Sequence, residues 1–138
     1  VRDFALDSTE ELAKLLEETG GSAESGLGLV VRLALPKGGA VYDLSGKFGA
    51  EPDAAIALLR VARPHAARLG VSFHVGSQCL DPAAYARATA LAAAVIRQAG
   101  VAVELLDVGG GFPVAYPDVV PPPLSAFTGA IAAAPSRK

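Results

Sequence analysis

The stretch LGLVVRLAL, residues 27–35, is an almost uninterrupted apolar run with a single arginine inside it, and the turn residues PKGG follow it. A run of this kind, rich in valine and leucine, is typical of a β-strand that is covered on both faces. Strands of this kind occur in parallel sheets, where the connecting helices cover the faces. The stretch therefore predicts a parallel α/β protein.

Strands and helices alternate on both sides of this run. We expect strands at 3–6 and 71–76, a strand followed by a glycine loop within 101–113, helices at 7–21, 50–70, 81–100 and from 124 to 134, and irregular stretches at 36–49 and 115–123. Ser8 and Glu11 have the spacing of a capping box. Gly70 would close the helix of 50–70, and Pro64 inside it predicts a kink or break. About four βα units result, which fit either a small open α/β sheet or part of a (β/α)8 barrel.

The composition narrows the class of protein. The chain has 138 residues, 51% of them hydrophobic, and a net charge of −2, which describes a globular domain without the basic surface typical of nucleic-acid binding. No apolar run approaches the roughly 18 residues of a membrane span, and one cysteine cannot form an internal disulfide, so we expect a protein of the reducing cytoplasm. The chain lacks methionine and begins in an apolar stretch, so we expect it to be part of a longer protein.

Candidate site residues follow the ends of successive predicted strands. Arg32 lies in the first apolar run, His74 in the strand of 71–76, and glycines 109–111 directly after LLDV. In parallel α/β proteins the carboxyl ends of the strands share one edge, and ligands bind there. We therefore expect these residues to gather at one site.

The glycine run favours an anion. Three residues without a Cβ let backbone N–H groups approach a phosphate closely, although a tight turn after a strand is the alternative interpretation. The run matches neither the Walker loop nor the dinucleotide pattern. Arg32 has two interpretations as well, because a buried guanidinium needs either an anionic ligand or an internal salt bridge.

His74 is interpreted either as a hydrogen-bonded core histidine or as part of the site. A zinc site is excluded because His65 has no carboxylate at helical spacing. A triad of Ser77, His74 and Asp107 is disfavoured by the lack of a G-x-S-x-G motif. Cys79 is expected to be a packing residue, since single cysteines are usually inert.

Three stretches, in this order, carry a resemblance: LSGKFG (44–49), SFHVGSQCLDP (72–82) and LLDVGGGFP (105–113). Together they resemble the fold-type III pyridoxal-phosphate decarboxylases, the ornithine, diaminopimelate and arginine decarboxylase family. The Cys and Asp-Pro after the Gly-Ser pair are more similar to the ornithine decarboxylases. The resemblance implies that residues 1–138 are a middle portion of a (β/α)8 barrel of the alanine racemase type, a partial barrel, with flanking barrel units and a β-rich C-terminal domain elsewhere in the protein.

The resemblance also implies pyridoxal 5′-phosphate as the cofactor, and a role for each motif residue. His74 would stack its imidazole on the cofactor ring, and Ser77 would hydrogen-bond the phosphate. Gly109, Gly110 and Gly111 would form the backbone cradle around that phosphate.

Two further positions follow from the resemblance. Arg32 would lie near the cofactor ring, and Lys47 would lie near the interface of a homodimer. The lysine that binds the cofactor covalently in this family would lie upstream, and the glutamate of an E-P-G-R motif downstream, so no catalytic residue is expected in this segment.

The expected activity of the full-length protein is decarboxylation of a basic amino acid, ornithine or lysine, to a diamine for polyamine synthesis. The segment alone is not expected to be active. Three alternatives stay open: a diaminopimelate decarboxylase of lysine biosynthesis, a non-catalytic regulatory relative, and an unrelated phosphate-binding α/β module.

Overall fold

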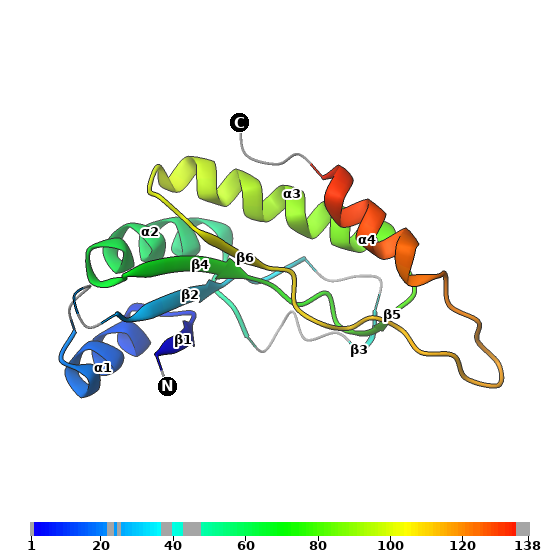
Figure 1. Cartoon of the computed structure of the whole chain (residues 1–138), viewed down its shortest axis with the longest axis horizontal. Helices are drawn as coiled ribbons and strands as arrows, with labels where there is room; N and C mark the ends of the chain where they lie inside the picture. The colour runs from blue at the N-terminus through cyan, green and yellow to red at the C-terminus, as the bar shows by residue number, and fades with distance from the viewer. Residues whose placement is uncertain (1, 22–23, 25, 37–39, 43–47, 135–138) are drawn as a thin grey trace.

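The structure is a computed structural model that describes residues 2–21, 24, 26–36, 40–42 and 48–134. Its elements are β1 (Asp3–Leu6), α1 (Thr9–Thr19), β2 (Gly28–Arg32), β3 (Ala40–Tyr42), α2 (Pro52–Ala62), the 3₁₀ helix η2 (Arg63–His65), β4 (Arg68–Ser72), β5 (Ser77–Cys79), α3 (Pro82–Ala99), β6 (Leu105–Asp107) and α4 (Leu124–Ala133). Figure 1 shows their succession along the chain. The alternation of strand and helix predicted from the sequence is confirmed.

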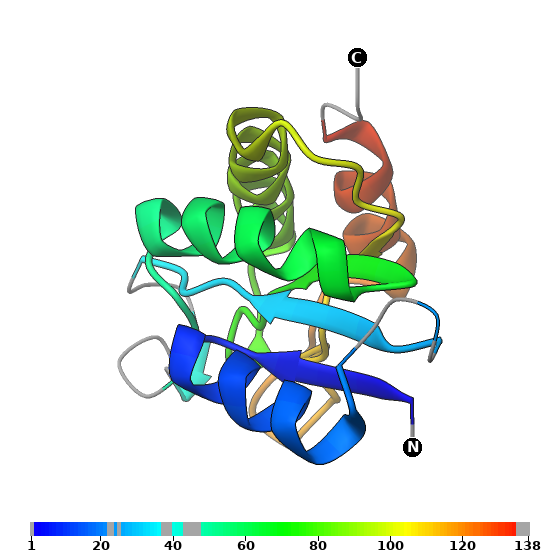
Figure 2. The same ribbon diagram turned by 90° about the vertical axis from the view of Figure 1, so that its left-hand side faces the viewer.

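Four strands form one parallel sheet in the order β1-β2-β4-β6. The spatial order follows the chain order without a reversal, as in a barrel and unlike a doubly wound sheet, which has a switch point. Because parallel crossovers are right-handed, this order places the connecting helices on the same face. Figure 2 shows α1, α2 and α3 following one another in this way, with α2 packed on β2 and α3 on β4.

The two faces of the sheet differ in burial. In β2 and just beyond it, Leu29, Val31 and Leu33 are almost fully buried, whereas Val30 and Arg32, which alternate with them, are half-buried. Successive side chains of a strand point to opposite faces, so the helices cover one face only. In the described part of the chain the expected coverage is therefore found on one face only, because the second face has no helix layer there.

The local signals for helix ends are largely confirmed. The Ser8 side chain accepts a hydrogen bond from the Glu11 N–H at 3.2 Å, and α1 ends at a left-handed Gly20. The expected break at Pro64 is present, since α2 ends at Ala62 and the chain continues as η2.

Gly70 was predicted to close that helix, and this is wrong. It lies inside β4, paired with Val30 and Leu105. A Cβ on Gly70 would lie 3.1 Å from the Leu105 Cβ, so the glycine allows close packing beside β6. The strand expected at 71–76 begins earlier, at Arg68, and ends at Ser72.

A second, antiparallel pair of strands was not predicted. β3 pairs with β5, with Ala40 opposite Cys79 and Tyr42 opposite Ser77. Figure 1 shows this pair beyond the carboxyl ends of β2 and β4. The stretch 36–49, expected to be irregular, therefore contains a strand, and this strand pairs with the segment that begins at Ser77.

The opposite end of the sheet is fixed by Glu104, just before β6. Its N–H donates to the Leu69 carbonyl at 2.8 Å, and its carboxylate accepts from the Leu69 N–H at 2.8 Å. Arg63 donates to the same carboxylate at 2.9 Å and to the Ala102 carbonyl at 2.9 Å. These bonds set the register of β6 on β4.

The strand expected within 101–113 is limited to β6, Leu105–Asp107, and the glycines follow it. The helices expected at 81–100 and from 124 to 134 are confirmed. α3 runs from an Asp81 cap, which accepts a hydrogen bond from the Ala83 N–H, to a left-handed Gly100. Residues 115–123 are irregular apart from the bridge between Tyr116 and Val119. Among the described residues, no helix combines the length and the apolar character that crossing a bilayer requires.

Candidate functional site

The segments after β4 and β6 lie against each other. The Phe73 N–H donates to the Asp107 carbonyl at 3.2 Å. A Cβ built on Gly110 would lie 3.5 Å from His74 Nε2, and one on Gly111 would lie 3.4 Å from His74 Cε1. The structure thus places His74 beside the glycine loop, residues 109–111, as expected for the ends of neighbouring parallel strands.

Two of the three glycines are required by this close approach. Gly109 has φ +70° and Gly111 has φ +93°, conformations that L-residues with a side chain rarely adopt. A Cβ on Gly109 would overlap the Phe73 carbonyl oxygen, and one on Gly111 would overlap the Gly76 carbonyl oxygen. The tight-turn interpretation is therefore correct for these two glycines, and it does not compete with a binding role.

The peptide groups of the glycine loop are held by neighbours from three elements. The Gly109 N–H donates to Asp107 Oδ1 at 2.8 Å, the Gly110 carbonyl accepts from the Tyr85 hydroxyl at 2.9 Å, and the Gly111 carbonyl accepts from the Cys79 N–H at 2.9 Å. Within the described part of the chain, the N–H groups of Gly110 and Gly111 donate to no protein acceptor. A fixed loop with free N–H groups is suited to bind an anion.

His74 offers a neutral imidazole at pH 7. Its Nδ1 accepts a hydrogen bond from the Gly76 N–H at 3.0 Å, so the proton of the neutral ring resides on Nε2, the atom nearer Gly110. Burial, and then the positive charge of Arg32, lower the pKa of His74 from its usual value, while Asp107 raises it. A half-buried, uncharged aromatic ring can pack against a flat ligand.

We expect the imidazole of His74 to titrate below 6.5, its ordinary value, in an NMR titration of the ring protons. Because the pKa in the folded state is lowered, this group's contribution to stability is complete above the unfolded-state value and is lost as the pH falls below it. Arg32→Gln should raise the midpoint and Asp107→Asn should lower it further, since they remove opposite charges. A wild-type midpoint at or above 6.5 would contradict the lowered pKa of His74.

Arg32 ends β2, with Ser72 opposite it on β4. Its guanidinium carbon lies 4.9 Å from the centroid of the Phe48 ring, a cation–π contact. None of the ion pairs among the described residues involves Arg32. The internal salt bridge considered from the sequence is thus not found in that part of the chain, and the contact with an anionic ligand remains a prediction.

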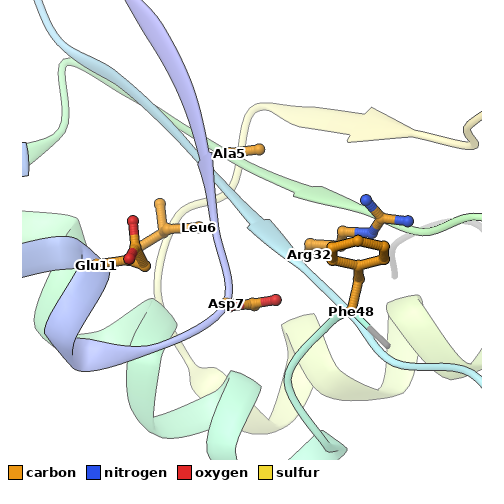
Figure 3. A pocket seen from close by; sticks show the side chains of 6 residues that line it. All are labelled: Ala5, Leu6, Asp7, Glu11, Arg32 and Phe48. Atoms are coloured by element: carbon orange, nitrogen blue, oxygen red, sulfur yellow. The ribbon is translucent and has the colours of Figure 1, made fainter. Parts of the chain in front are cut away.

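Figure 3 shows the side chains that line a small open pocket: Ala5, Leu6, Asp7, Glu11, Arg32 and Phe48. The Asp7 carboxylate accepts a hydrogen bond from the Gly49 N–H at 2.9 Å. This bond joins the end of β1 to the segment that carries Phe48, and so supports the position of the ring beside Arg32.

The other predicted site residues have distinct outcomes. Ser77 is exposed and begins β5, three residues from His74, so its place beside a bound phosphate remains a prediction. Lys47 lies outside the described residues. The triad is not formed, because His74 Nδ1 binds the Gly76 N–H and Asp107 binds the Gly109 N–H. Cys79 is buried, as expected for a packing residue.

Sequence reasoning missed one residue that holds the glycine loop and one that holds the segment after it. Tyr85 binds Gly110 from α3; its only signal was an aromatic ring in an alanine-rich helix. Gln78 has φ +54°, and its amide bonds both the N–H and the carbonyl of Val114, at 2.9 and 3.1 Å. No local pattern marked Gln78.

Comparison with known proteins agrees with this geometry. Residues 1–135 match the sequence model of the family described as "Pyridoxal-dependent decarboxylase, pyridoxal binding domain". The chain belongs to this family. The lysine/ornithine decarboxylase of Selenomonas ruminantium is 39% identical over 120 residues, which cover 83% of this chain and 29% of that protein. The ornithine decarboxylase of Mus musculus is 39% identical over 117 residues, 82% of this chain and 24% of that protein.

Solved structures of pyridoxal-dependent decarboxylases have the same fold. A mutant of SrLDC in complex with PLP aligns with a TM-score of 0.80 and 35% identity, covering 95% of this chain and 34% of that chain. The lysine/ornithine decarboxylase of Vibrio vulnificus, solved with cadaverine, aligns with a TM-score of 0.74 and 30% identity over 97% of this chain and 35% of that one. The chain is a partial barrel that spans about a quarter to a third of these relatives.

The residues present fit the family's cofactor, pyridoxal 5′-phosphate. The N–H groups of Gly110 and Gly111, which have no protein acceptor among the described residues, suit a phosphate. The His74 ring, which lies next to them, suits a flat pyridine ring. Among the described residues no cluster of metal-binding side chains competes for the site.

Proposed function

We propose that the protein containing this chain is a pyridoxal-phosphate-dependent decarboxylase of a basic amino acid, ornithine or lysine. The observation that carries the proposal is the contact between the glycine loop and His74, at the carboxyl ends of neighbouring strands of a barrel that matches the pyridoxal binding domain over residues 1–135. A diamine product, and with it a place in polyamine synthesis, follows from this substrate class.

Each site residue has a role in this proposal. Gly110 and Gly111 donate their N–H groups to the phosphate, and Ser77 adds a hydroxyl donor. His74 presents the face of its neutral ring to the pyridine, which orients the ring without adding charge. Arg32 adds a positive charge at the same edge of the sheet. Phosphate contacts made far from the reacting bond provide binding energy that positions it.

The cofactor, when bound, supplies an electron sink for the electron pair that remains when CO2 departs. None of the site residues of this chain is assigned to bond breaking. We propose that a lysine outside these 138 residues holds the cofactor covalently, and that the protein acts in the cytoplasm as a homodimer.

The names of the relatives support the choice of substrate. The matched proteins include lysine/ornithine and ornithine decarboxylases, and the Vibrio vulnificus structure contains cadaverine. The test is CO2 release by the full-length protein with added pyridoxal phosphate, measured for ornithine, lysine, arginine and diaminopimelate. Release from ornithine or lysine is expected. Release from diaminopimelate alone would replace the substrate assignment.

A second candidate is a non-catalytic regulatory relative. It is favoured by the match to antizyme inhibitor 2 of Mus musculus, which is 36% identical over 117 residues. This candidate predicts a folded full-length protein that releases no CO2 from any of the four amino acids. The same assay therefore separates the two functions.

A further inference from the structure

The side chain of Tyr85 is the contact that α3 makes with the glycine loop. Its hydroxyl donates a hydrogen bond to the Gly110 carbonyl at 2.9 Å. The side chain is fully buried, and burial raises the pKa of Tyr85 to about 12. The hydroxyl therefore remains protonated, and able to donate, throughout the neutral pH range.

Two aromatic rings fix the position of this hydroxyl. Phe112, the residue after the glycines, stacks on Tyr85 with 4.8 Å between ring centroids and 8° between ring planes. Phe127, from α4, meets Tyr85 edge-on at 5.7 Å and 83°. The ring is thus held from two sides, and one of the two contacts comes from the loop that the hydroxyl binds.

The geometry of the peptide bond carries this contact to the anion site. The Gly110 carbonyl and the Gly111 N–H belong to one planar peptide group, in which they point in opposite directions. Because Tyr85 binds the carbonyl, the free N–H of Gly111 is directed away from α3. Without the hydroxyl, a flexible glycine peptide could rotate and turn this donor away from its ligand.

We propose that Tyr85 is a positioning residue, which directs the Gly111 N–H toward the phosphate of the cofactor. This inference rests on the proposed function, since it takes pyridoxal phosphate as the anion. The proposal predicts that loss of the Tyr85 hydroxyl weakens binding of the phosphate group only, because Tyr85 acts through the peptide group that binds this phosphate.

The test compares two ligands and two variants of the full-length apoprotein. Tyr85→Phe removes the hydroxyl and retains the ring. Thr89→Val, on the same helix, removes another buried hydroxyl, one without a hydrogen-bond partner among the residues that the structure describes, and serves as the matched control. The dissociation constants for pyridoxal phosphate and for pyridoxal, which lacks the phosphate, are measured by absorbance or fluorescence titration.

Tyr85→Phe is expected to weaken binding of pyridoxal phosphate about tenfold, the effect of one hydrogen bond, and to leave pyridoxal binding unchanged. Thr89→Val should change neither. Unchanged binding of pyridoxal phosphate by Tyr85→Phe, or an equal loss for both ligands, overturns the positioning role while the proposed function stands. A wild-type protein that binds no pyridoxal phosphate overturns both.

A measurement on the wild-type protein avoids any dependence on how the variant folds. Amide hydrogen exchange is followed with and without pyridoxal phosphate. The Gly111 amide should exchange more slowly when the cofactor is present, because its N–H is then hydrogen-bonded. An unprotected Gly111 amide in the cofactor-bound protein overturns the inference.

Discussion

Gly111→Ala is expected to weaken the binding of pyridoxal phosphate by the full-length protein by roughly 100-fold, which corresponds to about 2.7 kcal/mol. The alanine Cβ would overlap the Gly76 carbonyl oxygen, and its φ of +93° is unfavourable for any residue with a side chain. The loop must then move away from His74, so the N–H groups of Gly110 and Gly111 lose their positions. A hydrogen bond to a charged group contributes about 1.5–3 kcal/mol, so losing one or two explains the magnitude.

Two other glycine substitutions separate strain from ligand contact. Gly129→Ala, in α4, places its Cβ in open space and should leave cofactor binding unchanged, with a gain in stability of about 0.5–1 kcal/mol. Gly110 has an ordinary backbone conformation, and its Cβ would make a normal contact with His74. Gly110→Ala should therefore fold stably. It should still bind the cofactor less tightly, because the added methyl group lies beside His74, where the cofactor would bind. Wild-type affinity in both Gly110→Ala and Gly111→Ala would show that the glycine loop is not the phosphate site.

His74→Ala is the second substitution with a large expected effect. Removing an aromatic ring from a stack with a heteroaromatic ligand costs about 1–3 kcal/mol, so the dissociation constant for pyridoxal phosphate should rise by roughly 5–150-fold. His74→Phe retains a flat ring and should recover part of this loss. The measurement is a fluorescence titration of the full-length apoprotein with the cofactor.

The other histidine provides the control. His65 lies in η2, and its Nδ1 lies 3.3 Å from the Gly21 carbonyl, far along the strands from the glycine loop. His65→Ala should leave cofactor affinity unchanged. If His74→Ala binds as tightly as the wild type, the ring does not pack on the cofactor, and its role is limited to the hydrogen bond with Gly76.

Features that depend on neighbours in the chain were predictable from the sequence. The Ser8 cap, the break at Pro64 and the full extent of α3 each follow from residues within one or two turns. The meeting of His74 with the glycine loop was also predictable, because parallel strands bring their carboxyl ends to one edge. The names of the cofactor and the family came from the resemblance of the motifs.

Features that depend on distant partners were not predictable. β3 forms only because residues 40–42 meet residues 77–79, and neither stretch alternates apolar and polar residues clearly enough to indicate a strand. Gly70 was assigned to a helix end because glycine has that role more often in local sequence. Its actual reason is the Leu105 side chain on the neighbouring strand. Tyr85 likewise acquires its role from a carbonyl 25 residues away along the chain.

Glu104 is fixed to Leu69 and Arg63, so the length of the short segment that follows it determines where the glycine loop lies. Five positions separate Glu104 from Gly109 along the chain, and each residue of a strand advances the chain by about 3.3 Å. One residue inserted into β6 would shift the glycines by that length past His74 and invert which side chains face the helices. Insertions between residues 104 and 111, natural or engineered, should therefore not be tolerated. Insertions should be tolerated after Val114, where the chain is exposed and its length does not determine the position of the glycine loop.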